Sequence, residues 1–517
     1  MKFEYEIGKS VSIGRAKEML RDDLRLVEIS TDLVETTYMD SFDWRLYSAS
    51  AVIESEQKNG STLLRWRDLN SHNFLYSETT TNKIGFASKL PVGAMQERLS
   101  KVLKLRALLS KVCLRVKRYH WVKLDREEKT VLKVTLEEYK LWDNEKASFQ
   151  KMGRRIRLKP IRGYQNPLKQ ADKILKTTSL VEPASIDIYL AALKYLGREP
   201  GDYKPKSIIH LPHDMRTDEA TKKLLLSMLD MLNANEDGVR NNIDSEFLHD
   251  FRIAVRKSRS AFNQIKNVFP RNVAERFRKQ LAWLGTLTSP ARDMDVYLLK
   301  IGDYRYMLPV ELRGHLEPLR DVIVKQRKSN YNLLVRGLNG KRYERFLSDY
   351  RKFLHLPVPV HTTLLNAPKP VKEVSDQRIW KMYRRVMKEG QAITLTSPDE
   401  ELHELRKTCK KLRYLIEFFQ SLYDSKQMAH LIETLKKLQD NLGDFNDLHV
   451  QMGKICELRE CMKMQGPVSE ETDNVIAKLN EKLNSLQSEK RKEFSGKFRQ
   501  FCEKGNINLY KQLFKSK

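Results

Sequence analysis

Residues 248–269 have the sequence LHDFRIAVRKSRSAFNQIKNVF, and LHELRKTCKKLRYLIEFFQSLY at 402–423 aligns with them without a gap. The offset of 154 residues continues from LAWLGTLTSPARDMDV (281–296) to LKKLQDNLGDFNDLHV (435–450). Over these 49 positions nine are identical, and five of the nine are charged or histidine: His249/His403, Arg252/Arg406, Lys257/Lys411, Arg259/Arg413 and Asp293/Asp447. A repeat kept only for packing would match mainly apolar residues. The duplication therefore predicts a functional surface present in both copies.

Each copy places basic residues along one side of a predicted helix, because residues three and four apart share a helix face. The two rows are His249, Arg252, Arg256 and Arg259, then His403, Arg406, Lys410 and Arg413. Like charges at these spacings cost roughly a few tenths of a kcal/mol per pair. One basic row is ordinarily a solvated face. Two matching rows in register predict an anion that lies along both.

The histidines that open the two rows have two interpretations. Each contributes to the anion site, or each holds a structural position satisfied by a carboxylate such as Asp293 or Asp447. A metal-binding role is disfavoured, because neither helix has a second His three or four residues away.

The chain has two regions of different pattern. Residues 1–163 contain alternating segments rich in β-branched and aromatic residues, which predict strands, with helical patterns near 14–24 and 94–106. A helical tail follows around 166–198, and a connector with Gly and Pro lies near 198–214. We therefore expect an N-terminal α+β domain at 1–200.

Residues 217–517 have apolar residues at three- and four-residue spacing, which predicts helices throughout. The Pro-rich segment HLPVPVHTTLLNAPKPV (355–371) divides them into repeat one (217–354) and repeat two (372–517). The predicted fold is an all-α domain of two helical bundles joined by a linker.

The chain of 517 residues has a formal net charge of +28. Residues 1–200 hold 37 Lys and Arg against 26 Asp and Glu, and residues 201–517 hold 58 against 41. Because both regions are basic, we expect a polyanionic partner. No apolar run is long enough for a membrane span, no leader pattern opens the sequence, and the five cysteines lack zinc spacing. A cytoplasmic protein without membrane contact is predicted.

The repeated motif resembles the CHAD family, the conserved histidine α-helical domain, over about 217–517. The second copy, ending in LKKLQDNLGDFNDLHV, is the closer match; the first has TLTSPARDMDV, where LTS stands for the family's usual Leu-Gly. The resemblance implies two four-helix bundles facing a basic channel that binds inorganic polyphosphate. It also implies that the channel is lined by His249, Arg252, Arg256, Lys257, Arg259, His403, Arg406, Lys410, Lys411 and Arg413.

The chemistry of the rows agrees with this implication. Polyphosphate has about one negative charge per phosphate and no bases, so it is bound by rows of guanidinium and ammonium groups. Single-stranded nucleic acid is usually bound with aromatic stacking, and Tyr414 is the only aromatic residue among the matched polar positions. Nucleic acid is therefore a disfavoured second ligand. A location on polyphosphate granules would follow from polyphosphate binding, whereas the oligomeric state is left open.

The first 200 residues resemble the CYTH family, the triphosphate-tunnel fold, which implies that this α+β domain is built on an antiparallel β-barrel or tunnel. Its opening Glu-x-Glu-x-Lys motif corresponds to Glu4, Glu6 and Gly8, and its tyrosine-x-aspartate segment to Tyr38 and Asp40. Alternating basic residues would face into the barrel as a second phosphate site: Arg65, Arg67, Arg115, Lys117, Arg155 and Arg157.

One departure argues against catalysis. The family has a late strand with two alternating glutamates that help hold a divalent cation, and here that strand has Arg155 and Arg157. Arginines repel Mg²⁺ or Mn²⁺ and remove oxygen ligands. Glu4 and Glu6, with Glu137 and Glu138, are the remaining weak candidates for one ion. We therefore expect no cofactor and a degenerate domain without hydrolysis; the alternative is a metal-dependent triphosphatase acting on inorganic or nucleoside triphosphate.

Overall fold

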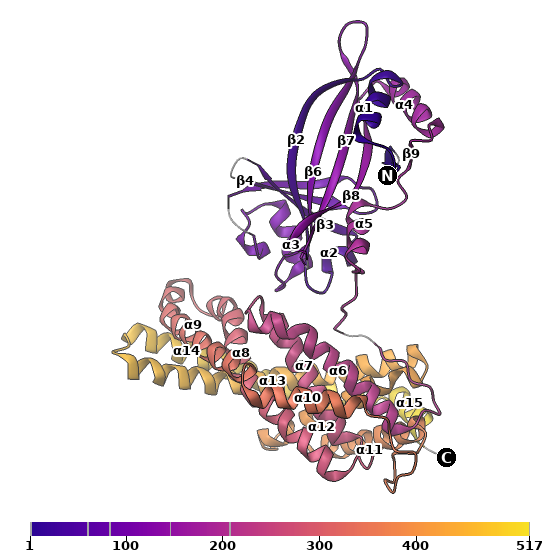
Figure 1. The fold of residues 1–517 in the computed structure, drawn as a ribbon. Coiled ribbons are helices and arrows are strands. Elements are labelled where there is room, and N and C mark those ends of the chain that lie inside the picture. The colour runs from indigo at the N-terminus through magenta and orange to yellow at the C-terminus, as the bar shows by residue number, and fades with distance from the viewer. Residues whose placement is uncertain (1–2, 59–60, 82–83, 145, 206–207, 516–517) are drawn as a thin grey trace. The chain divides into compact units, whose positions relative to one another are not determined.

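The computed structural model describes residues 3–515 except 59–60, 82–83, 145 and 206–207. The chain forms two compact units, residues 1–204 and 205–517 (Figure 1). The boundary lies within the Gly- and Pro-containing connector.

The first unit contains nine strands and several short helices. Its elements are β1 (Glu4–Ile7), α1 (Ile13–Asp22), β2 (Val27–Asp40), α2 (Arg45–Ser48), β3 (Ala51–Lys58), β4 (Ser61–Asp68), β5 (Phe74–Thr80), η1 (Ala87–Lys89), α3 (Ala94–Leu103), β6 (Leu109–Leu124), β7 (Thr130–Asp143), β8 (Ser148–Pro160), α4 (Gln165–Thr177), β9 (Val181–Pro183) and α5 (Ile188–Tyr195). The predicted strands and the two helical patterns are present. The sequence reasoning gave no strand for β2 or β5, and it placed β9 within the expected helical tail at 166–198.

All strand pairs are antiparallel, in the order β5-β4-β3-β2-β6-β7-β8-β1-β9. The predicted closed barrel is wrong, because in the described part of the chain β5 pairs only with β4 and β9 only with β1. The two end strands are short: β5 has seven residues and β9 has three. The sheet is open between them.

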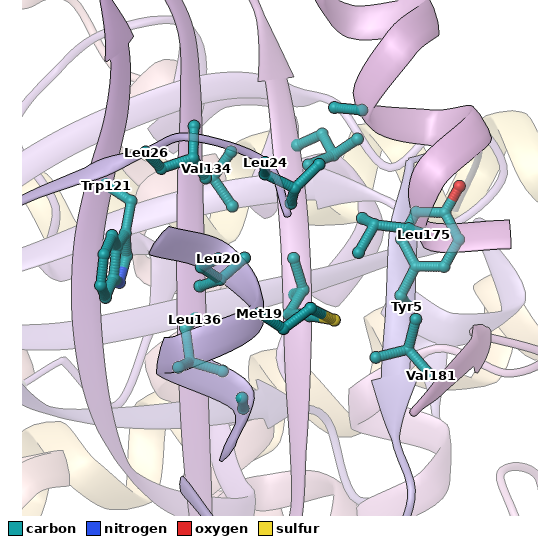
Figure 2. Close-up of a cluster of buried hydrophobic side chains, with 14 of the residues drawn as sticks. Tyr5, Met19, Leu20, Leu24, Leu26, Trp121, Val134, Leu136, Leu175 and Val181 are labelled. Carbon is teal, nitrogen blue, oxygen red and sulfur yellow. The ribbon is translucent and has the colours of Figure 1, made fainter. Parts of the chain in front are cut away.

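One face of the sheet is apolar. Helices α1 and α4 cover it, and Figure 2 shows Leu20 and Leu175 packed with Tyr5 and Leu136. Around α2 and α3, Leu99 and Leu103 join Ile53, Leu64 and Trp66 in a second cluster on this face. Burial of such side chains contributes about 25 cal/mol per Å² of apolar surface. The opposite face holds another buried cluster, in which Val52 and Leu114 pack against Tyr189 of α5, and it also carries buried charges.

The second unit is helical. Its elements are α6 (Thr217–Arg240), α7 (Ser245–Gln264), α8 (Arg271–Tyr306), η2 (Val310–Leu316), α9 (Glu317–Leu338), α10 (Lys341–His355), α11 (Val371–Ala392), α12 (Asp399–Phe419), η3 (Gln420–Leu422), α13 (Ser425–Gln465), α14 (Glu470–Phe501) and α15 (Lys504–Phe514). Three consecutive helices begin 154 residues before their counterparts: α6 and α11 at 217 and 371, α7 and α12 at 245 and 399, α8 and α13 at 271 and 425. The 154-residue offset of the sequence repeat is thus also the distance along the chain between the first residues of corresponding helices. The form of two four-helix bundles stays a prediction.

The halves of this unit share a core. Tyr304 of α8 and Ile323 of α9 pack in one buried cluster with Ile455 of α13 and Leu479 of α14. Within the first half, α6 and α7 approach closely at Gly238, where an added Cβ would overlap the Phe247 ring. Across the described residues, no helix is long and apolar enough to span a membrane.

Candidate functional site: the basic edges of α7 and α12

Helices α7 and α12 carry the two basic rows, and they are in contact with each other. The Nζ atom of Lys257 lies 2.8 Å from Oε2 of Glu417, which joins the two helices. The Asp244 carboxylate caps α7 by accepting from the backbone N–H groups of Glu246 and Phe247. Three acidic residues in the first turn of α12 favour its N-terminal dipole.

In the first row, Arg252 is held by the neighbouring helix. Its Nη1 donates to Gly285 O at 3.1 Å, Thr288 Oγ1 at 2.8 Å and Ser289 Oγ at 3.0 Å. Thr288 and Ser289 belong to the LTS segment that departs from the CHAD pattern. That departure provides acceptors for a buried guanidinium.

Arg256 and Arg259, further along α7, are exposed. Neither makes an ion pair with any residue that the structure describes.

In the second row, Arg406 donates to Asp447 Oδ1 at 3.1 Å. Arg413 lies 3.4 Å from Glu417 Oε1 through its Nε. Lys410 and Lys411 are half-buried and form no ion pair among the described residues. The Nε atom of Arg406 is buried and has no acceptor in the described part of the chain, so one cationic donor is left for another partner.

The two histidines take equivalent positions with opposite hydrogen-bond roles. Nδ1 of His249 lies 3.2 Å from Nη2 of Arg292, and because a guanidinium only donates, Nδ1 accepts. Nδ1 of His403 is paired with Oδ1 of Asn446, an oxygen that only accepts, so this Nδ1 donates. Arg292 and Asn446 are matched positions of the repeat. They precede by one residue Asp293 and Asp447, which the sequence suggested as partners.

The charge balance of this surface is strongly positive. Eight cations lie on the two rows and beside them: Arg252, Arg256, Lys257, Arg259, Arg406, Lys410, Lys411 and Arg413. In the described part of the chain four carboxylates act on them, those of Glu417, Asp447, Asp293 and Glu404. Burial, followed by the neighbouring cations Arg406 and Arg256, lowers the pKa of Lys410 to about 8. Burial and Arg256 likewise lower the pKa of Arg252 to about 10.

The sequence reasoning missed Glu417, Arg292, Asn446 and the hydroxyls of Thr288 and Ser289. Their types differ from those at the matched positions of the other copy, so the repeat alignment gave no signal. The acid Glu417 is aligned with Asn263, for example. Only the contacts between helices identify these residues.

The charged face of the first unit

The predicted second phosphate site is divided between the two faces of the sheet. Directly opposed residues of antiparallel strands point to the same side, and Glu6, Arg155, Glu137 and Arg118 oppose one another across β1, β8, β7 and β6. Arg65, Arg67 and Arg157 share this face. Arg115 and Lys117 alternate with Arg118 along β6, so they lie on the other face. The sequence reasoning thus included two residues of the wrong face and missed Arg118.

Each arginine of the charged face contacts two carboxylates. The pairs are Arg65 with Glu54 and Glu56, Arg67 with Glu54 and Asp187, Arg118 with Glu56 and Glu137, Arg155 with Glu4 and Glu6, and Arg157 with Glu4 and Glu137. Five cations thus face six carboxylates. Burial opposes ionisation of Glu56, yet hydrogen bonds and charge from Arg118 and Arg65 lower its pKa. This face is neutralised internally, in contrast to the α7–α12 surface.

The carboxylates considered for a metal do not fit a divalent cation. Glu4 lies 3.0 Å from Nη1 of Arg155, and Arg155 is positioned between Glu6 and Glu137 in the ladder. Glu138 points to the opposite face from Glu137. No group of three or more His, Cys, Asp or Glu able to hold a metal ion occurs among the described residues. The positions of the expected ligands are taken by guanidinium groups, which repel the ion.

Asp40 and Tyr38, the tyrosine-x-aspartate pair, have structural contacts. The Asp40 carboxylate accepts from the backbone N–H groups of Ser41, Leu46 and Tyr47, which fixes the turn into α2. Tyr38 is buried and stacks on Tyr189.

Comparison with known proteins

Residues 223–455 match the model of the CHAD domain. The C-terminal half therefore contains a CHAD domain, as the repeated motif predicted. Among solved structures, the CHAD domain from the plant Ricinus communis is 22% identical, with 57% of this chain and 95% of that chain covered and a TM-score of 0.47. PptA from Streptomyces chartreusis is 13% identical, with 56% and 98% covered and a TM-score of 0.41. The search of curated proteins found no match.

Proposed function

We propose that the α7–α12 surface binds inorganic polyphosphate without catalysis. The observation that carries this proposal is the charge balance: among the described residues, eight cations on two adjacent helices face four carboxylates, and five of the cations make no ion pair. A chain of phosphates would neutralise these side chains and accept from donors such as Nε of Arg406. The same cations would hold the protein on polyphosphate granules.

The first unit, in this proposal, is a CYTH-like domain that has lost its metal site. Its arginines are already paired with carboxylates, so it would neither hold a catalytic cation nor attract a free phosphate chain. Long-chain polyphosphate binding is therefore assigned to the helical unit alone.

The sharpest variant changes Arg256 and Lys410 together to Glu. Both lack ion pairs, so the fold should tolerate the change, and charge-assisted hydrogen bonds are lost at two positions. We expect at least about a hundredfold weaker binding of long-chain polyphosphate. The matched control is Arg345→Glu with Lys482→Glu, the same charge change at exposed positions of α10 and α14. Equal weakening in both double variants would show general charge attraction instead of a site.

Competition separates polyphosphate from nucleic acid. The protein is titrated with polyphosphate, tripolyphosphate and RNA at two salt concentrations. Affinity for polyphosphate should fall steeply with salt, because neutralised phosphates release counterions. If RNA displaces polyphosphate at equal phosphate concentration, the α7–α12 surface is a nucleic-acid site and the proposal fails.

A further inference from the structure

The Pro-rich segment between α10 and α11 plays no part in the proposed polyphosphate site, yet it is anchored at several points. The backbone N–H of Asn366 donates to Asn267 O at 3.0 Å, and its side-chain amide donates to Lys266 O at 2.8 Å. Nη2 of Arg216 donates to Pro359 O at 3.0 Å. These hydrogen bonds hold the segment against the rest of the helical unit.

Together with α6 and the turn before α8, this segment lines a cavity of about 710 Å³ that is open to solvent on one side. Its lining is mainly apolar and includes Phe269, Val273, Phe353, Leu356 and Leu364. Small-molecule sites typically have volumes of roughly 300–1,000 Å³, apolar walls and a few convergent polar groups. By size and lining, this cavity falls in that class.

One buried cation lies in the cavity wall. Lys222 is only 9% exposed, and its Nζ donates to Leu356 O and lies 4.9 Å from the centre of the Phe353 ring. Asp218, one turn earlier, is engaged by Arg216, whose Nε and Nη2 donate to its two oxygens at 3.1 and 2.7 Å. In the described part of the chain, no carboxylate lies within ion-pair distance of Lys222. Burial lowers its pKa, and the charge of Asp218, which also lines the cavity, opposes that shift.

We propose that this cavity binds a small amphiphilic anion: a flat, apolar body with a single carboxylate that pairs with Lys222. A buried ammonium that forms no ion pair is costly, and a carboxylate brought by a ligand would reduce that cost. The aromatic rings of Phe269 and Phe353 suit a planar body. This function goes beyond polyphosphate binding, because the cavity contains none of the ten residues predicted for the polyphosphate surface.

The test uses the full-length protein and two probes of equal shape, 2-naphthoate and the neutral 2-naphthamide, in calorimetric titrations. We expect naphthoate to bind at least about tenfold more tightly than the amide, the effect of one charge-assisted hydrogen bond. Lys222→Met, which keeps the apolar stem, should abolish that preference. Lys223→Met is the matched control, because the exposed Lys223 is its chain neighbour and lies outside the cavity lining.

Filling the cavity provides a second line of evidence. Val273→Trp should eliminate binding of both probes, and retained polyphosphate binding would show that the variant folds. Should Val273→Trp not fold, Thr363→Trp places the same ring from the exposed side of the segment. The proposal is overturned if the wild-type protein does not bind naphthoate, binds both probes equally, or if both filled variants bind naphthoate as before.

Discussion

Glu417 of α12 lies between two cations, with Oε2 at 2.8 Å from Nζ of Lys257 on α7 and Oε1 at 3.4 Å from Nε of Arg413. It is therefore both a bond between the two basic helices and a competitor of any bound anion. The Glu417→Gln variant should bind polyphosphate several-fold more tightly, because two cations are released. Its free energy of unfolding should fall by no more than about 1 kcal/mol, since the pair is partly exposed.

Polyphosphate titration and urea unfolding measure these two changes. Glu389→Gln, which breaks an ion pair with Arg385 on α11, is the control and should leave affinity unchanged. Unchanged or weaker binding by Glu417→Gln would contradict the assignment of Lys257 and Arg413 to the site.

Lys410 predicts a pH dependence of binding. Its pKa is lowered to about 8 by burial and by Arg406 and Arg256, so it is charged below pH 8 and becomes neutral above it. Affinity for polyphosphate should therefore decrease as pH rises through 8. The charged form is disfavoured in the folded state, so this group alone makes the free energy of unfolding increase as pH rises from about 8 to its ordinary pKa of 10.5.

The groups that surround Lys410 do not cancel this effect: Arg406 and Arg413 on α12 and Arg256 on α7 lower its pKa, and only Asp447 on α13 raises it. Binding titrations from pH 7 to about 9 measure the dependence. Lys410→Arg should remove it, because guanidinium stays charged throughout. A pH profile that is the same in both proteins would exclude Lys410 from the site.

In the first basic row, on α7, we expect Arg252 to stabilise the fold and Arg256 to contact the ligand. Arg252→Met removes the donor to Gly285 O, Thr288 and Ser289, so the free energy of unfolding should fall by about 1–3 kcal/mol. Arg256→Met, at an exposed position, should change it by less than about 0.5 kcal/mol. Denaturant unfolding compares the two, and equal stability of both variants would show that the contacts of Arg252 do not support the fold.

Close packing of α6 and α7 at Gly238 predicts intolerance to a methyl group. Gly238→Ala forces Cβ against the Phe247 ring, and we expect a loss of about 1–3 kcal/mol. Gly302→Ala on α8 meets nothing within 4 Å and should be neutral or stabilising by up to about 1 kcal/mol. Thermal unfolding distinguishes them, and similar behaviour of the two variants would refute the close approach.

The position of Arg155 leads to two predictions for the first unit, one about its free energy of unfolding and one about its lack of triphosphate hydrolysis. Arg155→Met removes a buried donor from Glu4, which keeps Arg157, so the free energy of unfolding should fall by about 1–3 kcal/mol. The exposed Arg162 provides the control substitution, Arg162→Met. Phosphate release from tripolyphosphate with Mg²⁺ or Mn²⁺ should be absent from the wild-type protein. Release that disappears in Glu4→Gln would instead establish the triphosphatase alternative.

The fold of the helical unit was predictable because its signals are local. Apolar spacing of three and four residues places His249, Arg252 and Arg256 on one side of a helix before any partner is known. In the first unit, alternation predicted most strands but not the open ends of the sheet, since closure depends on whether β5 and β9 meet. Alternation also requires Arg115 and Arg118 to lie on opposite faces, yet it does not tell which face is which.

The amino-acid sequence alone determined the duplication, the two basic rows and the replacement of late acids by Arg155 and Arg157, because each is a matter of residue type and short-range spacing. Only the tertiary structure decided which charges remain unpaired. Glu417 reaches Lys257 from another helix, and six carboxylates from distant segments neutralise the arginines of the sheet. Charge pairing depends on distances of a few ångströms between residues far apart in the chain, and no one-dimensional pattern encodes those distances.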